Sequence, residues 1–146
     1  MANSSIRLRE ATIGDSEGIA ALLAELGYPI DAAEIPSRLA AVASDNGATL
    51  VVADESDRPL GLVCLTRFAA LHTSGSIAYI TALVTASSAR RRGVGQLLIG
   101  GAKDWASRHH CVRLTVTSAE RRADAHAFYP ACGLPYTGRR FAISIA

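Results

Sequence analysis

Apolar and polar residues alternate in several short stretches of the sequence. Alternation of this kind predicts strands, because successive side chains of a strand point to opposite faces of a sheet. Turn residues, such as Asn46-Gly47 and the segment 56–59, separate neighbouring stretches. The expected strands span residues 6–9, 49–53, 60–67, 77–85, 112–117 and 138–146.

Three other stretches carry apolar residues three or four positions apart, which is the spacing of one helix face. The first follows a capping pair, Thr12 and Asp15, and ends at Gly27, a residue suited to a left-handed helix terminus. The second begins near Asp31 or Glu34, and its first residue stays open because a proline, Pro36, follows. The apolar positions are Ile19, Leu22, Leu23 and Leu26, then Leu39 and Val42, then Leu97, Leu98, Gly101, Ala102, Trp105 and Ala106.

Composition restricts the class of protein. The chain has 146 residues, 49% apolar and 19% charged, which predicts one folded domain over residues 1–146. A net charge of +2 and 5% aromatic residues argue against a broad nucleic-acid surface. Three cysteines without a C-x-x-C pair, and a start without an apolar signal segment, predict a reduced, cytoplasmic setting. No apolar run is long enough to span a bilayer, so we expect no membrane partner.

The sequence Arg90-Arg91-Arg92-Gly93-Val94-Gly95-Gln96 lies between a predicted strand and a predicted helix. The first N–H groups of a helix have no intrahelical partners, so a turn with glycines and arginines at this place suits an anion. A Walker phosphate loop would need G-x-x-x-x-G-K-[ST], which is absent. A dinucleotide-binding turn would need a third glycine where Leu98 stands. A tight turn with solvated arginines and no ligand is the remaining structural alternative.

Two short signatures occur in the second half of the sequence. The first is R-x-x-G-x-G, filled by Arg90, Gly93 and Gly95. The second is A-x-x-F-Y-x-x-x-G-F, a short helix with a glycine stop, and its positions are filled by Ala125, Phe128, Tyr129 and Gly133. Together they resemble the GCN5-related N-acetyltransferase (GNAT) superfamily, in which the first signature is the acetyl-coenzyme A pyrophosphate loop. The two signatures stand in the family's order and separation, so the resemblance covers nearly the whole chain.

The resemblance implies a fold, a donor and an activity. The fold would be mixed α/β, with a central, mostly antiparallel, twisted sheet and helices on both faces. The activity would be acetyl transfer from acetyl-coenzyme A to a small-molecule or peptide amine by direct attack. In the family, the strand before the loop separates from its neighbour and its free backbone groups bind the pantetheine arm. Residues matching the donor site are Leu83, Val84, Thr85, Arg90, Arg91, Arg92, Gly93, Val94, Gly95 and Gln96.

Tyr129 matches the family's proton donor to the departing thiolate. Two departures bear on it: Leu134 replaces the usual aromatic, and Pro130 follows the tyrosine, where we expect the helix to bend or end. Many relatives carry a glutamate on the strand before the loop, yet residues 77–84 contain no carboxylate. A water chain or a group from elsewhere, with His72 and Glu34 as first candidates, would have to take the proton of the amine.

Other interpretations of the same residues stay open. A non-catalytic acyl-coenzyme A sensor of the same fold is the first alternative, because the strand carboxylate is missing. A small nucleic-acid binder that uses the arginine run is the second, although we expect no nucleic-acid partner. Cys132 lacks a paired base and is expected to be a packing residue. No histidine or cysteine spacing predicts a metal site. A homodimer is left open, since relatives often pair through their C-terminal strands.

Overall fold

Five strands form one sheet in the order β1-β2-β3-β4-β5. They belong to a computed structural model that describes residues 5–117, 123–138 and 141–145. The strands are β1 (Arg7–Glu10), β2 (Gly47–Ala53), β3 (Pro59–Phe68), β4 (Ser76–Thr85) and β5 (Cys111–Val116). Neighbours from β1 to β4 pair antiparallel, and β4 pairs with β5 in parallel. The predicted mixed, mostly antiparallel sheet is therefore confirmed.

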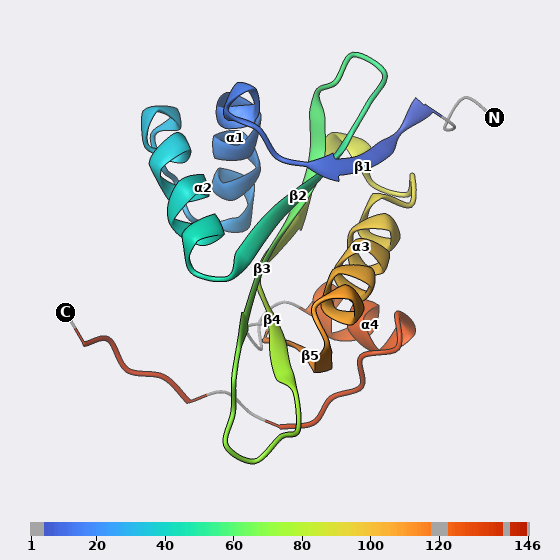
Figure 1. Cartoon of the computed structure of the whole chain (residues 1–146). Helices are drawn as coiled ribbons and strands as arrows, with labels where there is room; N and C mark the ends of the chain where they lie inside the picture. Colours follow the sequence, from blue (N-terminus) through green and yellow to red (C-terminus); the bar gives the residue numbers. More distant parts are fainter. Residues whose placement is uncertain (1–4, 118–122, 139–140, 146) are drawn as a thin grey trace.

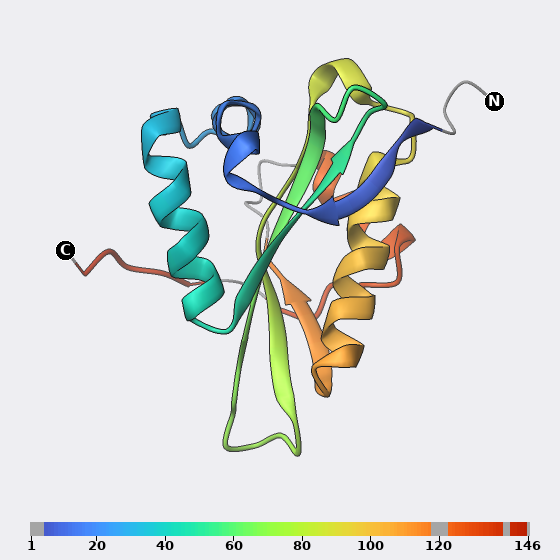
Figure 2. The same cartoon turned by 45° about the horizontal axis from the view of Figure 1, so that its top comes forward.

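Helices cover both faces of this sheet (Figures 1 and 2). One face is packed by α1 (Ser16–Leu26) and α2 (Ile35–Ser44), and the other by α3 (Val94–Arg108) and α4 (Ala123–Ala131). Short 3₁₀ helices, η2 (Ile13–Asp15), η3 (Ala32–Glu34) and η4 (Ser87–Ala89), precede α1, α2 and the arginine loop. Each face has its own apolar core. Trp105 of α3, which was expected in the core, is buried in the core between α3 and the sheet.

The ends of the first two helices follow the sequence signals. Asp15 accepts a hydrogen bond from the Thr12 N–H at 2.8 Å, so the predicted capping pair is confirmed. The first helix ends at Gly27 with φ of 109°, where the Tyr28 N–H reaches the Leu23 carbonyl at 2.8 Å. Pro36 lies in the first turn of α2, where a missing N–H costs nothing. The proline therefore belongs to the start of the helix and does not break it.

A buried carboxylate ties β1 to the start of α1. The Asp15 residue is 4% exposed, and its two carboxylate oxygens each accept a hydrogen bond from the Arg9 guanidinium at 2.8 Å. Arg9 also contacts Asp57 in the β2–β3 turn at 2.9 Å. The Arg9 hydrogen bonds hold the pKa of Asp15 below its usual value, against the opposing effect of burial.

This depressed pKa predicts a stability that depends on acid pH. Because the pKa of Asp15 is lower in the folded chain than in the unfolded chain, its contribution is complete above the unfolded value of about 4. The contribution is lost as pH falls through the folded pKa, by an amount on the order of 1 to 3 kcal/mol. Urea unfolding between pH 7 and pH 2 should show this loss, and Asp15→Asn should flatten it. Equal slopes in the two proteins would contradict the assignment.

The predicted last strand, 138–146, is not formed in the part that the structure describes. Residues 134–138 and 141–145 carry no strand, and residues 139, 140 and 146 lie outside the description. Alternation alone predicted the strand, but a strand also needs an edge to pair with, and this segment leads away from the sheet in both views (Figures 1 and 2). Its apolar side chains, Phe141, Ile143 and Ile145, are 85–91% exposed.

Candidate active site

The two halves of β4 have different neighbours. In its first half, β4 pairs with β5 from Ser76 opposite Cys111 to Ile80 opposite Val116, where the pairing ends. On its other edge β4 pairs with β3 along its whole length, as far as Thr85 opposite Gly61. Within the described residues, the β5-side edge of β4 after Ile80 therefore has no strand beside it. This separation is the one that the resemblance implied for Leu83, Val84 and Thr85.

A β-bulge interrupts the β3–β4 pairing at the point where β4 separates from β5. Cys64 of β3 stands opposite Ala82 and Leu65 stands opposite Ile80, so Thr81 is an extra residue in β4. The Thr81 hydroxyl donates to the Cys64 carbonyl at 3.2 Å and holds the irregular residue in place. A bulge bends its strand and increases the local twist. The pairing with β5 ends at this bulge, so within the described residues the second half of β4 has no strand on that edge.

The arginine loop connects this open edge to the start of α3. Arg90 and Arg91 are exposed and Arg92 is half-buried, and none of them makes an ion pair within the described residues. Gly93 is the N-cap residue of α3 with φ of 80°. Val94, 1% exposed, anchors the first turn in the core. Three guanidinium groups and the free N–H groups of a helix start thus belong to one short segment, which suits an anion.

The two loop glycines are needed for different reasons. A Cβ on Gly93 would meet no atom within 4 Å, so the space beside this residue is open. Glycine is needed there because the backbone is left-handed, with φ of 80°. A Cβ on Gly95 would lie 3.0 Å from Cζ and 3.2 Å from Cε1 of Phe128. The glycine of the first signature is therefore packed against the phenylalanine of the second. Sequence reasoning treated the two signatures separately and missed this contact.

Tyr129 lies on α4 beside Phe128, with the two rings 5.5 Å apart at 65°. It is half-buried and packs against the core under α3. The helix contains Pro130 and ends at Ala131, just before Gly133, the glycine stop of the second signature, which has φ of 91°. The Gly133 N–H reaches the Pro130 carbonyl at 3.0 Å, closing a Schellman-type turn.

A lysine from α3 stabilises the end of α4. The Lys103 ammonium donates to the Cys132 carbonyl at 2.6 Å, where the helix dipole favours a positive charge. No sequence pattern predicted this contact, because Lys103 and Cys132 belong to different helices. It fixes the helix that carries Tyr129 against the helix that begins at the arginine loop.

The candidate bases lie at different distances from the open edge. His72 is in the β3–β4 turn, so the length of β4, roughly 30 Å at 3.3 Å per residue, separates it from Thr85. Glu34 forms an ion pair with Arg38 at 2.9 Å. Glu25 of α1 was not one of these candidates, and its carboxylate accepts a hydrogen bond from the Ser87 N–H at 2.9 Å, three residues before the loop. Sequence reasoning did not single out Glu25, because only the fold brings α1 beside η4.

Gly61 of β3 is a second residue that sequence reasoning missed. A Cβ there would lie 2.6 Å from Cγ1 of Val94, 3.0 Å from the Val84 carbonyl and 3.1 Å from Cδ1 of Leu98. The glycine therefore allows the first turn of α3 to lie directly on β3 and β4. The signal was available, since a glycine inside a strand often marks a close approach by another element.

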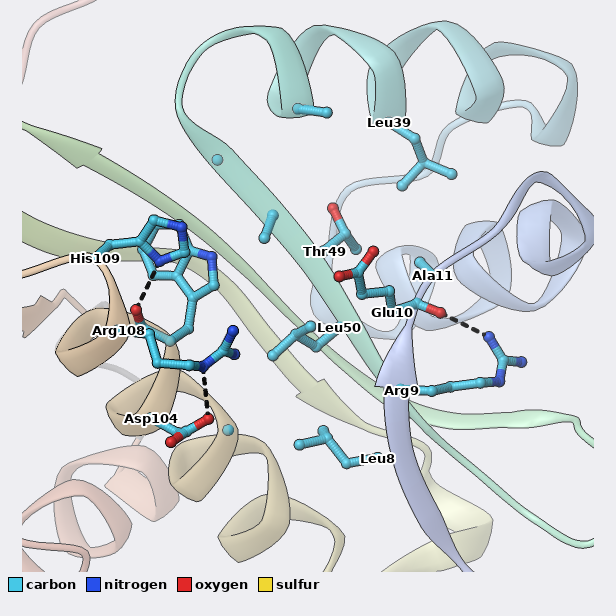
Figure 3. Close-up of a pocket in the computed structure, with 15 residues that line it drawn as sticks. Leu8, Arg9, Glu10, Ala11, Leu39, Thr49, Leu50, Asp104, Arg108 and His109 are labelled. Atoms are coloured by element: carbon cyan, nitrogen blue, oxygen red, sulfur yellow. Dashed lines mark hydrogen bonds and ion pairs between the residues drawn. The ribbon is translucent and has the colours of Figure 1, made fainter.

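A groove of about 580 Å³ lies at the other end of α3, between α2, β2 and α3 (Figure 3). It exists because β1 ends at Glu10, opposite Leu50, while β2 begins at Gly47. Glu10, Leu39 and Thr49 line one side, and Arg108 and His109 line the other. From Gly93 to Arg108 the helix rises by roughly 22 Å at 1.5 Å per residue, so this groove is separate from the arginine loop.

Neither a metal cluster nor a membrane-spanning helix occurs in the described part of the chain. Within residues 5–117, 123–138 and 141–145, no group of three or more histidine, cysteine, aspartate or glutamate side chains could hold a metal ion. No helix in these ranges is both long enough and apolar enough to cross a membrane.

Solved structures share this fold over nearly the whole chain. A putative acetyltransferase from Agrobacterium tumefaciens is 25% identical, with a TM-score of 0.84, over 95% of this chain and 99% of that one. Glucosamine-6-phosphate N-acetyltransferase from Arabidopsis thaliana is 17% identical, with a TM-score of 0.84, over 98% and 100%. AAC(6')-Iy in complex with the bisubstrate analogue CoA-S-monomethyl-acetylneamine is 17% identical, with a TM-score of 0.81, over 98% and 99%.

No curated protein sequence matches the chain. A family model does, and it spans residues 18–134, from α1 through the bulged strand, the arginine loop and the turn after α4. This range includes every element that builds the open β4 edge and both sequence signatures. The chain therefore belongs to the acetyltransferase (GNAT) family.

Proposed function

We propose that this protein transfers an acetyl group from acetyl-coenzyme A to the primary amine of a small molecule or peptide. The observation that carries the proposal is the open edge of β4 leading into the arginine loop. A thioester donor with a pyrophosphate presents a strand-like amide arm and an anionic end. Leu83, Val84 and Thr85 pair with β3 but have no strand on their β5 side within the described residues, so this edge suits the arm, and the loop 90–96 suits the phosphates.

The reaction requires two proton transfers besides attack by the amine. The amine nitrogen forms a bond to the thioester carbon, and the carbon–sulfur bond then breaks. In our proposal the Tyr129 hydroxyl gives its proton to the departing sulfur, since a phenol in water, with a pKa of about 10, still carries its proton at neutral pH. The proton of the amine leaves through water, because β4 carries no carboxylate between residues 77 and 84. The protein thus orients both substrates and supplies one acid.

The names of related structures support a small polar amine as the acceptor. One neighbour acts on glucosamine-6-phosphate, and another holds an analogue that joins coenzyme A to an acetylated neamine. At 17% identity these similarities show the fold alone, so the proposed acceptor class is an analogy with these proteins. The test is release of coenzyme A from acetyl-coenzyme A in the presence of amino sugars, polyamines and peptide amines. If an amine raises the release of coenzyme A above the rate of hydrolysis without amine, the result supports the enzyme.

The missing carboxylate on β4 also favours a second candidate, a non-catalytic acyl-coenzyme A sensor. The same assay separates the two, provided that calorimetry measures donor binding in parallel. A chain that binds acetyl-coenzyme A but releases no coenzyme A with any amine is a sensor. A chain that does neither contradicts both candidates.

The absence of a strand carboxylate predicts how turnover depends on pH. Without a protein base, the rate should rise with pH as the acceptor amine loses its own proton, and the midpoint should follow the pKa of the amine. The measurement is kcat/KM from about pH 5.5 to 9.5 with two amines whose pKa values differ by about two units. If the midpoint of the rise in kcat/KM falls at the same pH for both amines, a protein group acts as the base.

We also propose that the protein forms a homodimer that covers the segment 141–145. Phe141, Ile143 and Ile145 are 85–91% exposed, and β5 lies at the edge of the sheet with Val112 54% exposed. Exposed apolar segments and open sheet edges favour pairing with another chain. Light scattering should give twice the chain mass, and a triple change of the three residues to Ser should give a monomer. A monomeric wild-type protein at high concentration contradicts the dimer.

A further inference from the structure

We propose that Glu25 is a positioning residue that holds the arginine loop in the conformation that binds the donor. This inference rests on the proposed function, because it concerns the affinity for acetyl-coenzyme A. Glu25 lies near the end of α1, and Ser87 is 62 residues later, at the start of η4. The 2.9 Å hydrogen bond between them joins a helix on one face of the sheet to the segment that leads into the loop.

Successive backbone groups at the end of β4 are held by different partners. Thr85 pairs with Gly61 of β3, and the Ala86 N–H donates to the Leu60 carbonyl at 2.8 Å. The next N–H, that of Ser87, has no backbone acceptor within the described residues and donates to Glu25 instead. Glu25 therefore extends the anchoring of the chain by one residue beyond the sheet.

The chain after Ser87 depends on this anchor. Ala89 is buried, and its N–H donates to the Ala86 carbonyl at 2.9 Å, so η4 is a single short turn. Arg91 follows with φ of 66°, a left-handed conformation that is unfavourable for a residue other than glycine. A loop with such a residue stays in one conformation only if the segments on both sides are fixed. Val94 fixes the far side in the core, and Glu25 fixes the near side.

The role assigned to Glu25 is that of a hydrogen-bond acceptor and not that of a charge. A carboxylate bonded to Ser87, three residues before Arg90, would, as a charge, oppose the binding of a pyrophosphate at the loop. The two roles thus predict opposite effects of its removal. Loss of an acceptor frees the loop and weakens donor binding, whereas loss of a negative charge strengthens it. A glutamine keeps an acceptor oxygen on a side chain of the same length and removes the charge, so it separates the two roles.

The experiment compares Glu25→Ala, Glu25→Gln and Glu17→Ala with the wild-type protein. Glu17 is an exposed carboxylate in the first turn of the same helix, at the end opposite Glu25, so its removal is the charge-matched control. Calorimetry gives Kd for acetyl-coenzyme A, and steady-state assays give KM and kcat. Glu25→Ala should raise Kd and KM about three- to tenfold, the effect of one lost hydrogen bond, with kcat at saturation unchanged. Glu25→Gln and Glu17→Ala should remain within about twofold of the wild type.

A second measurement uses the protein without ligand. Hydrogen exchange of the Ser87 amide should be slow in the wild type and in Glu25→Gln, and at least about tenfold faster in Glu25→Ala, with the α3 amides unchanged. An unchanged Kd in Glu25→Ala, or tighter binding in both Glu25 variants, overturns the positioning role. If the wild type binds acetyl-coenzyme A without turnover, the sensor replaces the enzyme and the Kd series still decides the role of Glu25. If it binds no acetyl-coenzyme A, both proposals fail.

Discussion

Replacing Tyr129 by phenylalanine is expected to lower kcat by about 10²- to 10⁴-fold, the usual contribution of a general acid. The change keeps the ring that packs beside Phe128 and removes only the hydroxyl. The free energy of unfolding should therefore fall by no more than about 1 kcal/mol, and the Kd for acetyl-coenzyme A should change little. Turnover is measured with saturating donor and amine, under conditions in which chemistry limits the rate.

A matched control separates loss of the acid from loss of structure. Tyr136 is 75% exposed and lies after the end of α4, so Tyr136→Phe removes a hydroxyl outside the proposed site. It should keep wild-type turnover. A Tyr129→Phe enzyme within about threefold of the wild type would make Tyr129 a packing residue. A bend of α4 at Pro130 would then be the physical reason why its hydroxyl misses the sulfur.

The parts of the fold that the sequence predicted are those fixed by local signals. The capping pair of Thr12 and Asp15, the helix end at Gly27 and the burial of Trp105 each follow from a few neighbouring residues. The arginine loop is predictable for the same reason, since its glycines and cations are adjacent in the chain. Predicting which anion the loop binds required a second signature and the resemblance to a family.

The parts that could not be predicted depend on residues brought together from distant positions. The contact between Gly95 and Phe128, the space that Gly61 gives to Val94 and the bond from Glu25 to Ser87 each join different elements. The failed strand at 138–146 has the same origin. Its apolar alternation is a local property, whereas strand formation requires a pairing edge, and the described residues of the segment meet none.

A donor site built from the open β4 edge and the arginine loop predicts a specific pattern of ligand binding. Acetyl-coenzyme A should raise the melting temperature of the wild-type protein by mass action, and NAD should not, because the loop lacks a dinucleotide-binding turn. The change that tests the loop is Arg90→Gln with Arg91→Gln. Both side chains are exposed and make no ion pair within the described residues, so their loss should leave stability almost unchanged.

Donor affinity in this double variant should fall by about 10²-fold or more, because each guanidinium bonded to a phosphate contributes roughly 1.5 to 3 kcal/mol. The control is Arg38→Gln with Arg108→Gln, which removes the same net charge from surface ion pairs with Glu34 and Asp104. Such exposed pairs contribute little, so this control should keep both its stability and its wild-type Kd. Equal losses in the two double variants would mean that net charge attracts the donor. An unchanged Kd in the loop variant would mean that the pyrophosphate binds elsewhere, and that the arginines only surround a tight turn.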